Sequence, residues 1–221
     1  MIKHIFILAF LVIMTGCATG PVALDMPALD ESSSISVVDL RPDNEREIKN
    51  KIFSLAITSK AYGLYRLGNQ VTEPNLIRLF QHKLHESRPD LAPNAKVKVH
   101  HLVVYSNLKS ELRRSVTMGA ALGPVGAVVA SSTQKYGVEG RAELVDREKF
   151  NNTEKEYERA LYGAEENPDK SSVMFVYLDA EIDGEREFIR TMTPLRFSKD
   201  DKRIPYVVAV ETATSYFLDQ L

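Results

Sequence analysis

The sequence predicts an α+β domain in which a mixed or antiparallel sheet carries two amphipathic helices on one face. Three observations support this fold class. Several runs of the 221-residue chain alternate apolar and polar residues, which is the period of a strand. Two longer segments, 72–87 and 205–221, place apolar residues at spacings of three and four, which is the period of a helix. The shares of 44% hydrophobic and 26% charged residues are typical of a globular chain with its own core.

The first seventeen residues differ from everything that follows. Lys3 precedes an uninterrupted apolar run, residues 5–14, which leads through small residues to Cys17, the only cysteine. This order of charged, apolar and small segments is typical of a secretory signal peptide, and the run is too short for a membrane-spanning helix. The ending Met-Thr-Gly-Cys resembles the lipobox of bacterial lipoproteins, which places the signal peptide at residues 1–16.

The lipobox resemblance implies a lipid anchor. In bacterial lipoproteins the cysteine thiol takes a diacylglycerol, the peptide is cut before the cysteine, and the new amine is usually acylated, so Cys17 would be the lipidated residue. Several acyl chains hold a protein almost permanently, because each buried methylene contributes roughly 0.8 kcal/mol. Ala18 follows where the enterobacterial rule for inner-membrane retention requires Asp, which favours the outer membrane, with the protein facing the periplasm. The alternative is an ordinary cleaved signal peptide with an incidental cysteine.

Residues 17–34 are expected to comprise the lipidated Cys17 and a flexible tether. The segment 18–34 contains two prolines and a serine run and follows neither the helix period nor the strand period. A single periplasmic domain is then expected over residues 35–221. The formal charge of −2 and the lack of a basic block argue against nucleic acid as a partner.

The first half of the domain is expected to begin with strands over residues 35–40 and 51–58, both rich in β-branched and apolar residues. Residues 62–67 indicate a short strand or a packed loop. The clearest helix spans 72–87, with Thr72 as its N-cap. Its apolar stripe consists of Leu76, Ile77, Leu79, Phe80 and Leu84.

The second half is expected to contain mostly strands. Strict alternation over residues 97–105 predicts one long strand with a single face formed by Val97, Val99, His101, Val103 and Tyr105. Residues 136–147 and 154–162 indicate two more strands, the second exposed at an edge because its glutamates alternate with other polar residues.

A hairpin is expected near the C-terminus. Residues 172–182 and 185–192 flank Asp183-Gly184, and Asp-Gly between two such runs is typical of a type I′ turn. A helix through 172–182 is the competing interpretation, because its apolar residues also match helical spacing. The chain then closes with a helix over 205–221.

The order of these segments resembles the YajG-like group of small bacterial lipoproteins. Those proteins pair a strand ending in Asp-x-Arg with a segment containing Tyr-Gly and then an amphipathic helix. The matching residues here are Asp39, Arg41, Tyr62 and Gly63, within residues 35–87. The resemblance implies an α/β sandwich with helices on one face of a mixed sheet, and it implies no settled biochemical activity.

Residues 116–130 form a charge-free, glycine-rich run in an expected connection between strands. Such connections are normally polar, because buried backbone needs hydrogen-bond partners. The run could fold over the domain's own core, form a contact surface for a partner or a second copy, or dip into the bilayer. The residues selected as a candidate contact surface are Met118, Gly119, Leu122, Gly123, Val125, Gly126, Val128 and Val129.

Catalytic motifs are missing from the sequence. His82, His85 and one histidine of His100-His101 could together contribute to a metal site. The sequence spacing does not indicate the further carboxylate or histidine that such a site would need, so neither metal nor cofactor is expected. No nucleophile elbow, zinc-protease motif or phosphate-binding loop occurs. The sequence therefore predicts a non-enzymatic, lipid-anchored binding or envelope-assembly module with a protein partner or self-association. A periplasmic small-ligand carrier or enzyme is the alternative.

Overall fold

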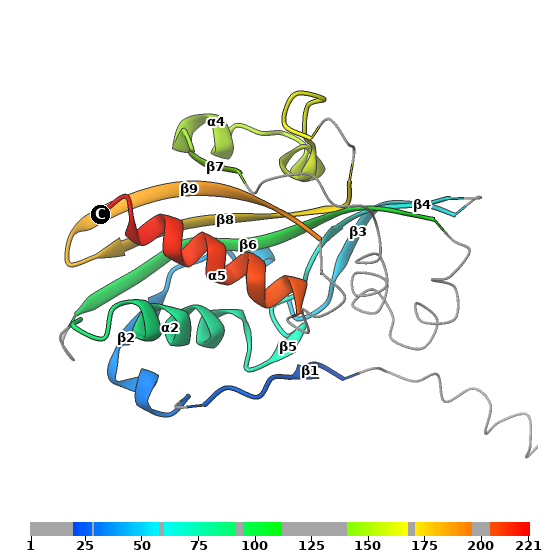
Figure 1. The fold of residues 1–221 in the computed structure, drawn as a ribbon. Helices are drawn as coiled ribbons and strands as arrows, with labels where there is room; N and C mark the ends of the chain where they lie inside the picture. The colour runs from blue at the N-terminus through cyan, green and yellow to red at the C-terminus, as the bar shows by residue number, and fades with distance from the viewer. Residues whose placement is uncertain are drawn as a thin grey trace, which may run out of the picture.

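The computed structural model describes residues 20–27, 29–57, 60–91, 95–111, 141–167, 171–195 and 204–221. Within these residues, a seven-stranded, mostly antiparallel sheet is combined with helices, which confirms the α+β fold class. Two long helices cover one face of the sheet and shorter turns cover the other (Figure 1). Cys17 and the run 116–130 lie outside the described residues.

The sheet is built around one long strand. Across the sheet the order is β3 (Lys51–Ile57), β4 (Lys60–Arg66), β6 (Lys96–Glu111), β8 (Val173–Ile182), β9 (Glu185–Pro194) and β7 (Arg141–Leu144), all antiparallel. β6 pairs with β8 along one edge. Along its other edge it pairs first with β2 (Ser36–Asp39), in parallel, and then with β4. The strands expected over 35–40 and 51–58 are confirmed, and 62–67 belongs to a strand rather than a loop.

The expected hairpin is confirmed between β8 and β9. All ten residues of β8 pair with β9, which contradicts the competing helix. Asp183 has a φ of 52° and Gly184 a φ of 99°, so both central residues of the turn adopt the positive φ that a type I′ turn requires.

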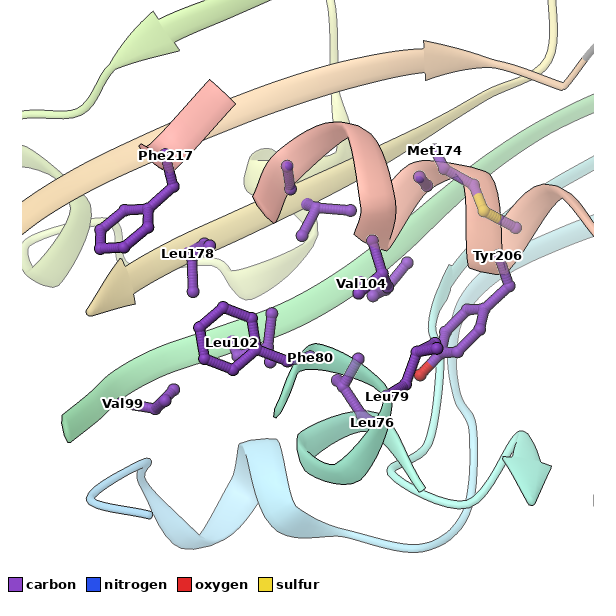
Figure 2. Close-up of a cluster of buried hydrophobic side chains, with 14 of the residues drawn as sticks. Leu76, Leu79, Phe80, Val99, Leu102, Val104, Met174, Leu178, Tyr206 and Phe217 are labelled. Atoms are coloured by element: carbon purple, nitrogen blue, oxygen red, sulfur yellow. The ribbon is translucent and has the colours of Figure 1, made fainter. Parts of the chain in front are cut away.

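The two long helices are α2 (Leu76–Ser87) and α5 (Pro205–Leu218), and they share one core with the sheet. Figure 2 shows the two helices directing side chains toward β6 and β8. The buried residues labelled there include Leu76, Leu79 and Phe80 from α2, Tyr206 and Phe217 from α5, and Val99, Leu102, Val104 and Leu178 from the strands. α2 starts later than expected, because Asn75 rather than Thr72 is the N-cap and accepts a 3.0 Å hydrogen bond from the Arg78 backbone N–H.

The strict alternation expected along residues 97–105 is wrong at one point. The pairing of β6 with β8 shifts register between Val99 and His101, which leaves one extra residue in β6. Val97 and Val99 therefore face the helices, whereas Val103 and Tyr105 face the opposite side and belong to a second core. One strand thus supplies apolar residues to both faces of the sheet.

The strand expected over 154–162 is also wrong. These residues include a 3-10 helix, η4 (Glu156–Ala160), and the expected strand 136–147 is described only as β7 before a short helix, α4 (Arg147–Asn151). Glu156 turns toward the sheet, where its Oε2 lies 2.8 Å from Lys51 Nζ and its Oε1 3.1 Å from Arg66 Nε. The alternating charges therefore hold a turn against the second face instead of forming an edge strand.

The segment expected to be a tether packs on the domain wherever the structure describes it. β1 (Val22–Ala23) pairs in parallel with β5 (Thr72–Glu73). Leu24 and Met26 pack against the core of the two long helices. The following turn, η1 (Glu31–Ser34), lies beside α2. Proline-rich composition suggested a free segment, but these side chains gain burial and backbone hydrogen bonds by docking.

Candidate functional site: a charged trough on the second face

A cavity of about 640 Å³ opens on the second face of the sheet. β7, β8 and β9 contribute residues to one part of its lining, and α4 and the segment 158–166 contribute most of the rest. We call this cavity the Arg190 trough. It is lined by Glu143, Leu144, Val145, Asp146, Lys149, Phe150, Thr153, Glu158, Arg159, Leu161, Tyr162, Gly163, Glu166, Tyr177 and Arg190.

Arg190 is held rigidly in this trough. Its Nη1 donates hydrogen bonds of 2.8 Å to both Glu143 Oε1 and Glu166 Oε1, and its Nη2 donates to the Leu161 carbonyl oxygen at 3.1 Å. The guanidinium carbon lies 4.4 Å from the centroid of the Phe175 ring, within cation–π range. A second cavity of about 230 Å³ is also lined by Arg190, Glu143 and Glu166, so this charged trio borders both cavities.

A second arginine is fixed in the same way. The guanidinium carbon of Arg159 lies 3.8 Å from the centroid of the Phe150 ring, and its Nη2 donates to the Phe150 carbonyl oxygen at 3.1 Å. The Tyr177 hydroxyl donates to the Arg159 carbonyl oxygen at 2.9 Å. Two stacked guanidinium groups therefore lie among aromatic rings. A guanidinium group binds a planar group or a carboxylate better than the ammonium group of a lysine does.

Burial and charge set the protonation of the trough. Burial acts to raise the pKa of Glu166, but the hydrogen bonds from Arg190 and the Gly163 N–H, together with the positive charge of the nearby arginines, outweigh it, and the net pKa is lowered. Burial raises the pKa of Tyr162 to about 12 and also raises the pKa of Tyr177. At neutral pH the trough therefore presents carboxylates, guanidinium groups and neutral phenols.

Comparisons of the chain with protein-family models, curated proteins and solved structures found no significant match.

The structure does not test the two sites selected from the sequence. Cys17 and the candidate contact residues between Met118 and Val129 lie outside the described residues. Within the described residues, no helix is long and apolar enough to cross a membrane. No group of three or more His, Cys, Asp or Glu side chains in that part of the chain could hold a metal ion.

Three of the histidines considered for a metal site, His82, His100 and His101, each lie close to a carboxylate. His82 is buried in α2, where its Nε2 lies 3.3 Å from Glu86, and burial lowers its pKa. On β6, His101 Nδ1 lies 2.8 Å from the buried carboxylate of Glu45, which belongs to η2 (Asp43–Arg46). The neighbouring His100 lies close to a glutamate of β8 instead.

Asp39, Arg41 and Gly63, three of the residues that carry the YajG-like resemblance, have structural roles, whereas Tyr62 is 43% exposed. Arg41 is almost fully buried, and its Nε and Nη2 donate to the two carboxylate oxygens of Asp39 at 2.9 Å. Its Nη1 reaches the Leu102 carbonyl oxygen at 3.2 Å and so ties the end of β2 to β6. At Gly63 a Cβ would overlap the ring of Tyr65, so glycine leaves room for that buried ring.

Sequence reasoning did not find Arg190, although the sequence contained a signal for it. Phe188, Arg190 and Met192 alternate along β9 and face the second core, so the arginine lies within an apolar face. A charged residue within an apolar face is costly to bury unless it is paired and hydrogen-bonded, so its presence there indicates a specific set of partners. Its neighbours Phe150 and Tyr177 come from other parts of the chain, and their meeting could not be read from spacing.

Proposed function

We propose that the protein is a lipoprotein anchored by Cys17 to the periplasmic face of the outer membrane, where it binds a partner protein without catalysing a reaction. The observation that carries the proposal is the lipobox-like ending Met-Thr-Gly-Cys after a charged residue and an apolar run. The Arg190 trough supports the binding role. Leu161, which lines the trough, is 44% exposed, and its carbonyl oxygen lies 3.1 Å from Arg190 Nη2, beside fixed charges of both signs. Aromatic side chains and arginine, which gather in this trough, are enriched at protein-binding surfaces.

The anchor is tested by changing its cysteine. We expect the wild-type chain to incorporate labelled palmitate, and Cys17→Ser to incorporate none and to keep its signal peptide. Ala18→Ser is the matched control, because it makes a similar small change one residue later and leaves the thiol in place. Equal palmitate labelling of wild type and Cys17→Ser would refute the anchor.

Binding is tested by crosslinking in the cell envelope. A photoreactive amino acid at Leu161 should yield a discrete crosslinked protein band, because this exposed side chain lines the trough. The same residue placed at Leu221, which is 36% exposed at the C-terminus, is the control. Identical crosslinking patterns from the two positions would remove the trough as the binding surface. The candidate contact run 116–130 would then be the surface to examine.

A small-ligand carrier is the second candidate, because the volume of about 640 Å³ is within the range of ligand sites and the base of the cavity is aromatic. Native mass spectrometry of protein purified gently from envelopes distinguishes the two functions. A carrier should retain an added mass that is lost on denaturation, and it should give no protein crosslink from Leu161.

A further inference from the structure

We propose that the outer part of β3 rests on the lipid bilayer, with Ile52 and Leu55 as the contacting side chains. This inference rests on the proposed lipid anchor at Cys17 and adds a second point of contact. Together the two contacts would give the domain a fixed orientation on the membrane surface, instead of leaving it free on a long tether.

The distance between the anchor and the domain is short. Only residues 18–21 separate Cys17 from Val22, whose backbone N–H donates a 3.0 Å hydrogen bond to the Val71 carbonyl oxygen. Two residues later, the Leu24 N–H donates to the Glu73 carbonyl oxygen at 2.8 Å. Five Cα–Cα steps of a fully extended chain span at most about 18 Å. A lipidated Cys17 would therefore keep the start of β1 within that distance of the acyl chains.

The start of β1 and the apolar side chains of β3 lie on the same side of the sheet. Leu24, next to β1, packs into the core formed by the sheet and the two long helices. Tyr65 of β4 belongs to that same core and is paired with Ile52. Leu55 is paired with Gly63, two residues before Tyr65, and so shares this face. In Figure 1, the chain enters β1 from the end of the molecule toward which the β3–β4 hairpin extends.

This part of the sheet lacks the cover that the long helices give elsewhere. α2 and α5 lie over β6, β8 and β9, whereas Ile52 and Leu55 remain 54% and 51% exposed. β3 is also an edge strand with no further strand paired to it among the described residues. An apolar, unpaired edge is an aggregation hazard in water. Membrane contact would remove these side chains from water. Exposed apolar patches often mark sites of membrane or protein interaction.

The chain contains no tryptophan, so a single introduced Trp reports its own surroundings. Leu55→Trp is compared with Leu144→Trp, which replaces a 59% exposed leucine on β7, at the opposite edge of the sheet. Both full-length, lipidated variants are placed in vesicles of phosphatidylethanolamine and phosphatidylglycerol, with and without bromine on the acyl chains. We expect the emission of Leu55→Trp to shift to shorter wavelength and to be quenched by bromine. The emission of Leu144→Trp should show neither change.

The outcomes separate this inference from the anchor. Palmitate labelling with no bromine quenching of Leu55→Trp would keep the anchor and overturn the membrane contact. A shift to shorter wavelength without quenching would place Leu55 against protein, such as a second copy paired along β3, and would also overturn it. Absence of palmitate label from the wild-type chain would instead refute the proposed function, whatever the Trp emission shows.

Discussion

Phe80 offers the most direct test of how the helices are attached to the sheet. Its side chain is fully buried on α2, in the same core as Val99 and Leu102 of β6 (Figure 2). An aromatic side chain buries about 150–250 Å². At roughly 25 cal/mol per Å², burial of this area stabilises the fold by about 4–6 kcal/mol. Alanine keeps a small part of the contact but leaves a cavity, so Phe80→Ala should cost about 3–5 kcal/mol.

That loss is large enough to measure without ambiguity. For a domain of 150–250 residues, each kcal/mol corresponds to a change in melting temperature of about 2–4 °C, so we expect a decrease of about 6–20 °C. The assay is urea and thermal unfolding of the chain from Gly20 onward, followed by far-ultraviolet circular dichroism. Ser87→Ala, at an exposed position of the same helix, is the control and should change stability by less than about 0.5 kcal/mol. A loss below about 1 kcal/mol for Phe80→Ala would refute the packing of α2 on the sheet.

Three further changes test other parts of the molecule. Gly68→Ala should destabilise the fold by about 1–3 kcal/mol, because its Cβ would overlap a backbone carbonyl oxygen, whereas Gly20→Ala has open space and should melt like the wild type. Burial acts to raise the pKa of Asp39, but the hydrogen bonds and charge of Arg41 outweigh it, and the net pKa is lowered. The stabilisation of the fold by ionised Asp39 is therefore present above the ordinary Asp pKa of about 3.9 and is lost as pH falls through the folded value. Unfolding at several pH values should therefore show Asp39→Asn less stable than wild type at neutral pH, with the difference shrinking below about pH 4; a pH-independent difference would contradict this. Val125→Asp should leave the melting temperature unchanged and abolish self-association, because an unpaired charge in a desolvated interface costs several kcal/mol; a large drop in melting temperature with unchanged sedimentation would make residues 116–130 ordinary core.

The sequence predicted those elements whose signals are local. The β8–β9 hairpin has Asp-Gly at the two positions that need a positive φ, and α2 has its apolar residues on one stripe. These properties belong to a few neighbouring residues and do not depend on the rest of the fold. The fold class followed from them, because a sheet and two amphipathic helices can bury their apolar faces only against one another.

The remaining features depend on contacts between distant segments. The register shift at His100 depends on how β6 pairs with β8 and cannot be read from the alternation of β6 alone. Residues 20–34 contain only a few apolar side chains, and their docking depends on the surface that β5 and α2 provide. The Arg190 trough collects side chains from β7, α4, β8 and β9. The exposed charges of residues 154–162 match a turn as well as an edge strand, and their contact with Lys51 and Arg66 decided between the two.

The position of β6 at the centre of the sheet also affects how the protein unfolds. Because β6 contributes Leu102 and Val104 to the core under the long helices and Val103 and Tyr105 to the core on the other face, neither layer has a strand of its own at the centre of the sheet. Separation of either layer would expose one side of a strand on which the other depends. The amide protons of β6 are therefore expected to exchange only through global unfolding. A destabilising substitution in either core should lower the protection of amide protons across the whole sheet.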